Sequence, residues 1–408
     1  MSTGLEQARG HFLDGVAHFE QGRLVEARAC FEASLALAPG RASVLGNLGI
    51  TLYRLGETRQ AGAVLAEAVA ADPRHAEAWV TLGLAAHADG DWQQAVAALE
   101  RGLALQPGPA PTWLTLGRCR QRLGALEAAL EAFEQAVAVD PGRAEAWTER
   151  GTVLRALGRN EAAAESFRQA LDRGGDAALN HFFLASVSGA PGPASPPRRY
   201  VESLFDDYAP EFESHLVGEL GYCGHTQLLA PLLATGRRLT AALDLGCGTG
   251  LCGERLRGRA EAVDGVDVSA AMVAQARARG VYRDLWHADL LEHLNANTRS
   301  YGLVMAADVF IYVGELDGIF GEVRRCLEAE GCFLFTVELL AGTDAAHPQN
   351  DAAPVLQPSL RYAHSEAYLR ALAQRHGFVV DVLMQAPIRY EQGCPVQGAY
   401  VHLRRAPS

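Results

Sequence analysis

Residues 243–250 read L-D-L-G-C-G-T-G, a short apolar segment that runs into three glycines at alternate positions, Gly246, Gly248 and Gly250. Glycines let the backbone turn tightly and let a ligand approach it without intervening side chains. The dinucleotide pattern G-x-G-x-x-G would need a glycine at position 251, where the sequence has Leu251. Asp244 precedes the loop, and its carboxylate suits a ligand that carries an ammonium group better than a pyrophosphate. The loop therefore predicts a nucleotide-like ligand other than a dinucleotide.

The residues around this loop alternate between short apolar runs and helical stretches, which is typical of an α/β fold with a parallel sheet. We expect strands that end in 243–245 and others near 262–268, 283–287, 303–306, 332–337, 378–384 and 398–404. Helices are predicted near 270–279, 316–327 and 365–375. Seven strands in this order predict a Rossmann-like sheet, in which ligands bind at the carboxyl ends of the strands.

Polar residues follow several of these strands. Asp267 ends the second strand, where a carboxylate can accept hydrogen bonds from both ribose hydroxyls. The alternative role for Asp267 is a helix N-cap, which Ser269 would fill better. Met272 suits either adenine packing or an ordinary helix face. Asp289 follows the third strand, and it is either an acceptor for the adenine amino group or a plain loop aspartate.

These residues together predict a site for S-adenosylmethionine. Its candidate residues are Asp244, Gly246, Cys247, Gly248, Gly250, Asp267, Val268, Met272, Asp289, Leu290 and Asp308.

The residues that would carry out catalysis are not identified by any motif. Asp308 ends the fourth strand, where a transferred methyl group should emerge, and His215, Tyr312 and Arg389 are further candidates. Arg389 would suit an acidic acceptor. A general base is needed only for some nucleophiles, and the possible bases are His215, His225, His287, His364 and Glu338.

The first half of the chain repeats with a period of 34 residues. Five positions recur in phase, in series that begin at Gly15, Gly22, Ala27, Pro39 and Trp79. Small residues at the first and third series suit close helix crossings, and glycine at the second suits a turn. The pattern resembles the tetratricopeptide repeat, a helix-turn-helix unit that stacks into a solenoid. Five repeats cover roughly residues 8–177, and a helix near 178–187 would cap them.

We therefore expect a repeat array over 1–187, a linker over 188–197 and a second domain over 198–408. The linker reads S-G-A-P-G-P-A-S-P-P, which predicts a semi-extended, hinge-like segment. The array is interpreted either as a groove for a protein or peptide, or as a spacer or self-association surface.

The composition of the chain limits which partners, metals and cell compartments are expected. The net charge of -12 argues against a nucleic-acid partner, because phosphate binding needs a basic surface. The eight cysteines lack metal-ligand spacing, so no metal is expected, and they favour a reducing compartment. No run of about 20 apolar residues is present, so we expect a cytoplasmic protein without a membrane partner.

The second half resembles class I S-adenosylmethionine-dependent methyltransferases of the ubiquinone- and menaquinone-biosynthesis kind, on the loop, V-D-V-S and A-D-V-F-I-Y-V-G. The whole chain resembles predicted bacterial methyltransferases with tetratricopeptide repeats. The resemblance implies that 199–216 is a helical lead-in over the cofactor, with Tyr200, Phe205, Tyr208 and His215 facing cofactor or substrate. It also implies that 389–396 lies near the substrate mouth.

Three functions stay open. The first is methylation of a small molecule, with the repeats holding a partner or a second copy. The second is methylation of a protein or peptide held by the repeats. The third is a non-catalytic adaptor that binds S-adenosylmethionine.

Overall fold

The computed structural model describes residues 2–214, 218, 221–340, 353–391 and 393–407. The chain divides into two compact units, Met1–Asn180 and His181–Ser408. The division lies before the boundary expected at residue 187. No helix within the described ranges is long and apolar enough to cross a membrane.

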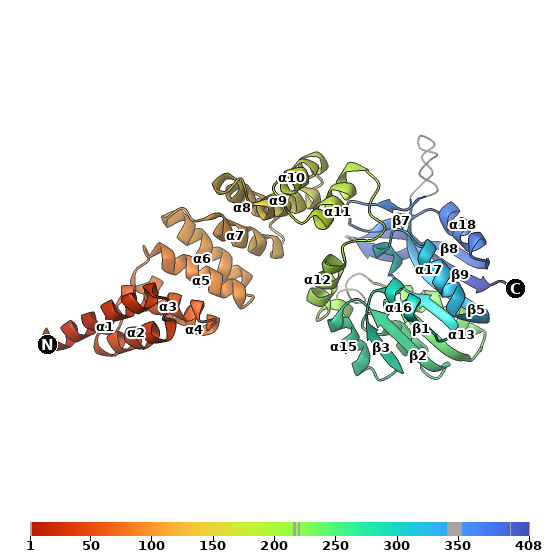
Figure 1. The fold of residues 1–408 in the computed structure, drawn as a ribbon, viewed down its shortest axis with the longest axis horizontal. Coiled ribbons are helices and arrows are strands. Elements are labelled where there is room, and N and C mark those ends of the chain that lie inside the picture. The colour runs from red at the N-terminus through yellow and green to blue at the C-terminus, as the bar shows by residue number, and fades with distance from the viewer. Residues whose placement is uncertain (1, 215–217, 219–220, 341–352, 392, 408) are drawn as a thin grey trace. The chain divides into compact units, whose positions relative to one another are not determined.

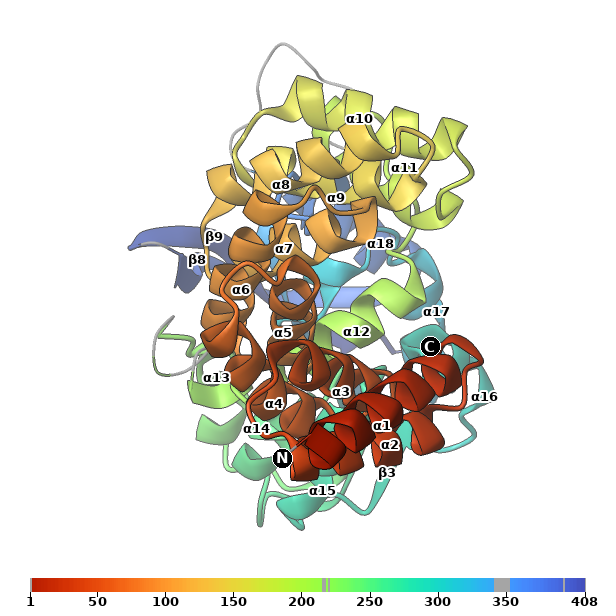
Figure 2. The same ribbon diagram turned by 90° about the vertical axis from the view of Figure 1, so that its left-hand side faces the viewer.

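The first unit consists of antiparallel helix pairs that follow one another along the chain (Figures 1 and 2). The pairs are α1(Ser2–Glu20) with α2(Leu24–Leu37), α3(Ala42–Arg54) with α4(Thr58–Ala71), α5(Ala76–Ala88) with α6(Trp92–Leu105), α7(Ala110–Arg122) with α8(Leu126–Val139), and α9(Ala144–Ala156) with α10(Asn160–Asp172). The helix α11(Ala177–Ser188) follows, close to the predicted capping helix, and spans the division between the units.

One packing contact recurs in every pair and explains the glycine series. A Cβ atom at Gly15 would lie 2.6 Å from the ring of Phe31, and a Cβ at Gly49 would lie 2.4 Å from Leu65. The same relation, sixteen residues apart, holds at Gly83, Gly117 and Gly151. Any larger residue in the first helix would therefore displace the buried side chain of the second, which is why the repeat requires glycine there.

The second unit is built on a twisted sheet that includes the predicted parallel strands. Its elements are α12(Arg198–Tyr208), α13(Gly224–Ala234), β1(Leu239–Leu245), α14(Leu251–Arg255), β2(Ala260–Asp267), α15(Ala270–Ala278), β3(Asp284–His287), α16(Leu290–Ala296), β4(Tyr301–Ala306), η2(Phe310–Tyr312), α17(Asp317–Cys326), β5(Leu327–Leu339), β6(Val355–Leu356), β7(Tyr362–His364), α18(Glu366–Arg375), β8(Phe378–Glu391) and β9(Cys394–Arg405). Strands β3, β2, β1, β4 and β5 run parallel in that order.

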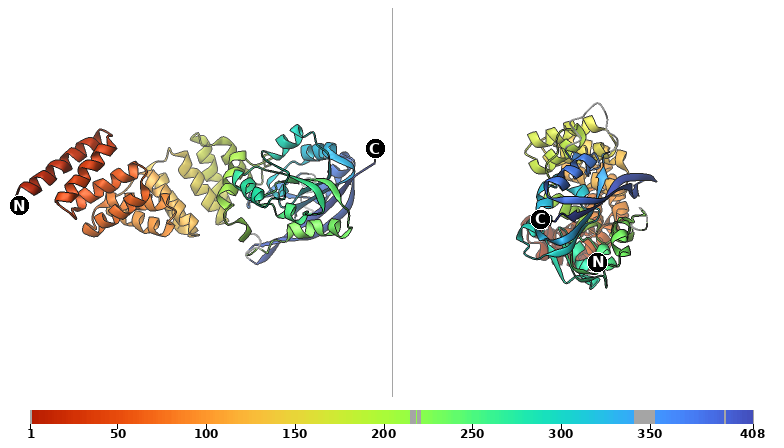
Figure 3. Two further views of the ribbon diagram at one scale, coloured as in Figure 1. Left: turned by 90° about the horizontal axis from the view of Figure 1, so that it is seen from below. Right: turned by 90° about the vertical axis from the view of Figure 1, so that its right-hand side faces the viewer.

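The last two strands complete the expected seven. Strand β9 pairs antiparallel with β5, and β8 pairs with β9 in a long twisted ribbon (Figure 3). Nine strands are present among the described residues, because β6 and β7 add to the predicted seven. Glu338 of β5 pairs with β9 on one side and with β7 on the other. Strand β7 therefore lies on the β4 side of β5, beyond the end of β4, where the ligand cavity of such a sheet is expected.

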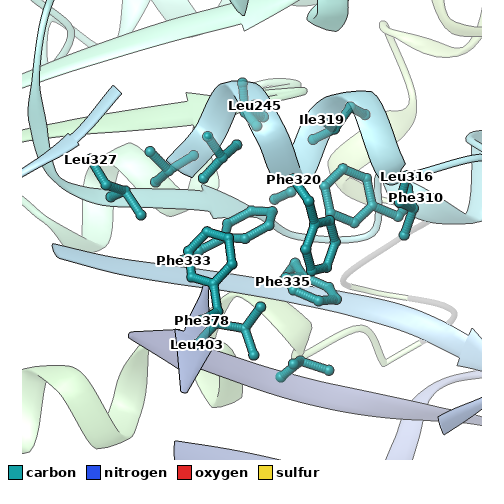
Figure 4. Packing of buried hydrophobic residues seen from close by; sticks show 14 of the residues in the cluster. Leu245, Phe310, Leu316, Ile319, Phe320, Leu327, Phe333, Phe335, Phe378 and Leu403 are labelled. Atoms are coloured by element: carbon teal, nitrogen blue, oxygen red, sulfur yellow. The ribbon is translucent and has the colours of Figure 1, made fainter. Parts of the chain in front are cut away.

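Buried side chains on both faces hold the sheet. One face packs against α13 and α14 through Leu228, Leu229 and Cys252. The other face packs against α16, α17 and α18, and Phe310, Phe320, Phe333, Phe335 and Phe378 cluster there (Figure 4). Because both faces of the sheet are covered, the sequences of β1 and β4 are almost continuously apolar. Successive side chains of these strands point alternately to the two clusters.

The segment 188–197 belongs to the second unit and packs against the rest of it. Tyr362 donates a hydrogen bond from its hydroxyl to the Pro193 carbonyl at 2.6 Å, and two backbone amides of 314–315 donate to the Ala194 carbonyl. Pro196 is buried. Apart from Ser188, which ends α11, the segment has no regular secondary structure, as its composition predicts, but these contacts tie it to β7 and to residues 314–315.

Candidate active site

A cavity of about 540 Å³ opens at the carboxyl ends of β1, β2 and β4. The loop after β1, the ends of β2 and β4 and the helix α12 line it, with the β6–β7 turn and Arg389. Every predicted cofactor residue except Gly250 lines this cavity, as do Asp308, Tyr312 and Arg389. His215 lies outside the described residues. No cluster of three potential metal ligands occurs in the described part of the chain.

The loop after β1 requires its three glycines. Gly246, Gly248 and Gly250 all have positive φ, at 64°, 52° and 95°. This left-handed region strains residues with a side chain. A Cβ atom at Gly246 would also lie 2.5 Å from Val309, whereas one at Gly248 would have nothing nearer than 4.0 Å. The loop is thus a cradle that leaves room for a ligand over Gly248.

Two buried carboxylates flank the loop. Asp267 accepts hydrogen bonds from the Gly248 amide at 2.8 Å and from the Ser269 amide at 2.9 Å, so it links the loop to the end of β2. Burial raises the pKa of Asp267, and those amide hydrogen bonds oppose the shift. Burial raises the pKa of Asp244 to about 7, although the Tyr282 hydroxyl donates to it at 2.7 Å.

The helix cap predicted near Asp267 lies where expected. The Ser269 hydroxyl accepts a hydrogen bond from the Met272 amide at 3.1 Å and begins α15. Asp289 also has a capping role, because its Oδ1 accepts from the amides of Leu291 and Glu292 at the start of α16. Asp289 is therefore more than a plain loop aspartate, and it faces the cavity as well.

The lead-in helix α12 and the residues after it are fastened along α15. Asp206 accepts from the Ser269 hydroxyl at 2.6 Å and the Ala271 amide at 3.2 Å, and the Gln275 side chain donates to the Ala209 carbonyl. No described residue of α12 is buried, although Leu204, Phe205 and Tyr208 line the cavity. An apolar helix face is thus turned to a space that a ligand would fill.

A buried ionic network forms the wall beyond β4. Arg389, with a side chain 1% exposed, lies between Asp308 at 3.2 Å and Glu338, to which it also donates. Arg361 lies 3.8 Å from Glu338 and bonds the Tyr312 side chain. Asp308 has a φ of 60°, and its amide donates to Thr336 at 2.8 Å. Such a conformation in a residue other than glycine is costly, and it is common at functional sites.

This network changes the role expected for Arg389. Two carboxylates neutralise its charge inside the protein, so it orders the wall more than it offers a charge to an acceptor. Arg361 is the cation of this wall that retains a partly exposed side chain, at 24%. Burial raises the pKa of Glu338, and Arg389 opposes that shift.

The four candidate bases that lie in the described part of the chain do not converge. His364 is fully buried against the Gly314 carbonyl at 3.0 Å, His287 bonds the Val268 carbonyl, and neither lines the cavity. Glu338 is held by Arg389 behind the cavity wall. His225 does line the cavity, and burial lowers its pKa. The wall beyond β4 thus offers arginine and carboxylate groups, and His225 is the candidate base that lines the cavity.

Three cavity residues carry no sequence signal. Arg361 enters from a turn between two very short strands, and Tyr222 and Phe212 come from the stretch between α12 and β1. Tyr282 carries no signal either: it bonds Asp244 of the cavity wall across 38 positions in the chain. Only the three-dimensional arrangement brings these side chains to the cavity or to its wall.

Comparison with protein families agrees with the division of the chain into two units. Residues 242–331 match the family model described as a methyltransferase domain. Models of the tetratricopeptide repeat match residues 3–42 and 47–110, residues 82–146 and residues 144–173. The chain therefore combines tetratricopeptide repeats with a methyltransferase domain.

Two curated relatives are similar to part of the chain. The chain is 31% identical over 145 residues to a malonyl-[acyl-carrier protein] O-methyltransferase of Geobacter sulfurreducens, covering 34% of this chain and 53% of that protein. It is 35% identical over 100 residues to the enzyme of the same name from Legionella pneumophila, covering 23% and 34%. The chain thus spans about half and a third of the lengths of these relatives.

Solved structures similar to part of the chain include repeat proteins. MamA is 28% identical with a TM-score of 0.37, covering 39% of this chain and 94% of that one. YrrB, described as a tetratricopeptide repeat protein with an unusual peptide-binding site, is 21% identical with a TM-score of 0.39, covering 42% and 88%.

Proposed function

We propose that the protein is an S-adenosylmethionine-dependent methyltransferase that acts on a small-molecule acceptor. The observation that carries this proposal is that the glycine loop after β1 forms a cradle between the carboxylates of Asp244 and Asp267. Three left-handed glycines leave space over Gly248, and Asp244 and Asp267 flank that space. The loop and both carboxylates lie inside the segment that matches a methyltransferase domain.

The residues suit the cofactor part by part. Asp267 would hold the ribose hydroxyls, because a carboxylate can accept from both. Asp244 would face the ammonium group, and Met272 and Leu290 would contact the adenine. Asp289 would accept a hydrogen bond from the adenine amino group. S-adenosylmethionine supplies an electrophilic methyl group, so the protein has mainly to align the acceptor with it and exclude water. The aromatic face of α12 is placed to exclude water.

An acidic acceptor fits the opposite wall. Both curated relatives are named for O-methylation of a malonyl group on an acyl-carrier protein, and such a group presents a carboxylate. A carboxylate is ionised at neutral pH and needs no general base, which agrees with the lack of convergent bases. Arg361 is the side chain proposed to bind it, since guanidinium groups pair with carboxylates through two parallel hydrogen bonds.

The repeat array is proposed to bind a protein partner or a second copy of the chain. Its helices form the stacked pairs that other repeat proteins use for binding, and its sequence matches the repeat models over most of its length. The acceptor of the relatives is carried on a protein, so a carrier protein is one partner of suitable chemistry. A cytoplasmic location belongs to this proposal.

The competing function is methylation of a protein or peptide held by the repeats. Incubation of the full chain with methyl-labelled S-adenosylmethionine and a cell extract separates the two. We expect label in acid-soluble small molecules or in acyl groups that alkali releases from a carrier protein. Label retained on polypeptide side chains after that treatment would favour the competing function. Asp267→Ala protein serves as the inactive control.

A further inference from the structure

Tyr282 connects the first strand to the start of the third. It lies two residues before β3, and its hydroxyl donates a hydrogen bond to Oδ2 of Asp244 at 2.7 Å. Asp244 is 1% exposed and lines the cavity. The Gly253 amide also bonds this carboxylate. Tyr282 is therefore a side chain that donates a hydrogen bond to this buried carboxylate.

The position of the tyrosine ring is fixed by three glycines. A Cβ atom at Gly253 would lie 2.5 Å from the ring, one at Gly265 would lie 2.9 Å from it, and one at Gly250 would lie 3.1 Å from it. These glycines belong to α14, β2 and the cradle loop. The ring thus packs closely against all three positions, in a slot that side chains at these positions would obstruct.

The other titratable groups around Asp244 do not help to keep it ionised. Burial raises the pKa of Asp244 to about 7, and the charge of the neighbouring Asp267 carboxylate also acts to raise it. The thiols of Cys247 and Cys252 are close, and burial raises their pKa values, so they are neutral. The phenol and the Gly253 amide are the groups that favour the charged form, because they donate to the carboxylate.

We propose that Tyr282 is a positioning residue that keeps the Asp244 carboxylate ionised and aimed at the ammonium group of the cofactor. This inference rests on the proposed function, because it needs a ligand with an ammonium group in the cradle. It assigns the pH dependence of cofactor binding to one hydrogen bond. Binding weakens as the pH falls through 7, because protonated Asp244 no longer attracts the ammonium group.

The test is Tyr282→Phe in the full chain, which keeps the ring in its slot and removes only the hydroxyl. Calorimetric titrations with S-adenosylhomocysteine, which has the same ammonium group, are made between pH 6 and pH 9. A hydrogen bond to a charged group corresponds to a pKa change of about one to two. We therefore expect the midpoint of the pH dependence to rise by about one to two pH units, with affinity at pH 7 at least about fivefold lower.

Two controls make the result specific. Methylthioadenosine lacks the amino acid part, so its affinity should be equal for the wild type and Tyr282→Phe. Tyr301→Phe removes a buried phenol that donates to another carboxylate, Asp264 at 3.0 Å, outside the cavity. This variant should bind S-adenosylhomocysteine with the wild-type pH profile.

The possible failures are distinguishable. Wild-type protein that binds neither ligand would contradict the proposed function itself. Wild-type binding with an unchanged profile in Tyr282→Phe would overturn the role of Tyr282 alone. An equal loss of affinity for both ligands would also overturn it, because the phenol would then support the loop in general and not the ammonium contact.

Discussion

Asp267 combines two duties in one side chain. Its hydrogen bonds to the amides of Gly248 and Ser269 shape the cradle, and it lines the space where the ribose is proposed to bind. Hydrogen bonds to a charged group contribute about 1.5–3 kcal/mol. We predict that Asp267→Ala lowers the affinity for S-adenosylmethionine at least tenfold in calorimetry while the domain stays folded. Asp381→Ala removes an exposed carboxylate paired with Arg404 and should leave the affinity unchanged.

His364 predicts a pH dependence of stability. It is buried and neutral, and burial lowers its pKa from 6.5 to about 4. Below pH 6.5 the unfolded chain binds a proton that the folded chain does not bind, so stability falls as the pH falls from 6.5 towards 4. This group should cost about 2 kcal/mol between pH 7 and pH 5.

Urea unfolding of residues 181–408 measures this effect, because Trp286 is the only tryptophan in that range. His364→Gln should lose less stability than the wild type on acidification from pH 7 to pH 5. Equal losses in the two proteins would show that His364 does not contribute. The corresponding substitution at exposed His11 of the full chain should change nothing in the second unit.

Candidate site residues could be named from the sequence where a motif fixes both the residue type and its position at the end of a strand. Asp244, Asp267 and the three glycines follow that rule, because the loop geometry tolerates little else. The roles of Arg389 and Tyr282 could not be predicted, because each depends on partners far along the chain: Asp308 and Glu338 for the arginine and Asp244 for the tyrosine.

At the scale of elements, the β6–β7 turn carries Arg361, the side chain proposed to bind the acceptor. It brings Ser359, Leu360 and Arg361 to the cavity, and Leu360 adopts a φ of 65° in this turn. With a malonyl thioester as acceptor, we predict that Arg361→Gln raises KM about tenfold or more and leaves S-adenosylmethionine affinity unchanged, since an ion pair to the acceptor is lost. Arg198→Gln is the matched control, because Arg198 also lines the cavity but pairs with Glu202 and Glu292. Equal KM values for both variants would exclude Arg361 as the acceptor contact.

The sequence predicted mainly those elements in which apolar residues recur at regular spacing over many positions. The helix pairs and the seven main strands fall near their expected positions, and all but β3 contain several buried residues that show a pattern. Strands β6 and β7 contain two and three residues, which is too short for a period to be seen. The docking of 188–197 was also beyond prediction, because it relies on Tyr362 and on backbone amides that any sequence carries.

At the scale of the whole molecule, each unit has its own buried core. Residues 181–408 enclose both faces of the sheet, and the cavity is lined only by residues of this unit. We predict that the fragment 181–408 folds and binds S-adenosylmethionine within about threefold of the full chain, because no contact of the cavity is removed. Turnover of a free malonyl thioester should be retained, whereas turnover of a carrier-bound acceptor should fall if the repeats hold the carrier. A folded fragment without cofactor affinity would contradict this division of roles.

The central claim is that the cavity at the ends of β1 and β2 binds S-adenosylmethionine. Calorimetric titration of S-adenosylmethionine into the full chain at pH 8, where Asp244 is ionised, tests it most directly. We predict saturable one-to-one binding that S-adenosylhomocysteine competes for and that Asp267→Ala weakens at least tenfold. No heat of binding from a folded protein at millimolar ligand, or binding that Asp267→Ala leaves unchanged, would contradict it.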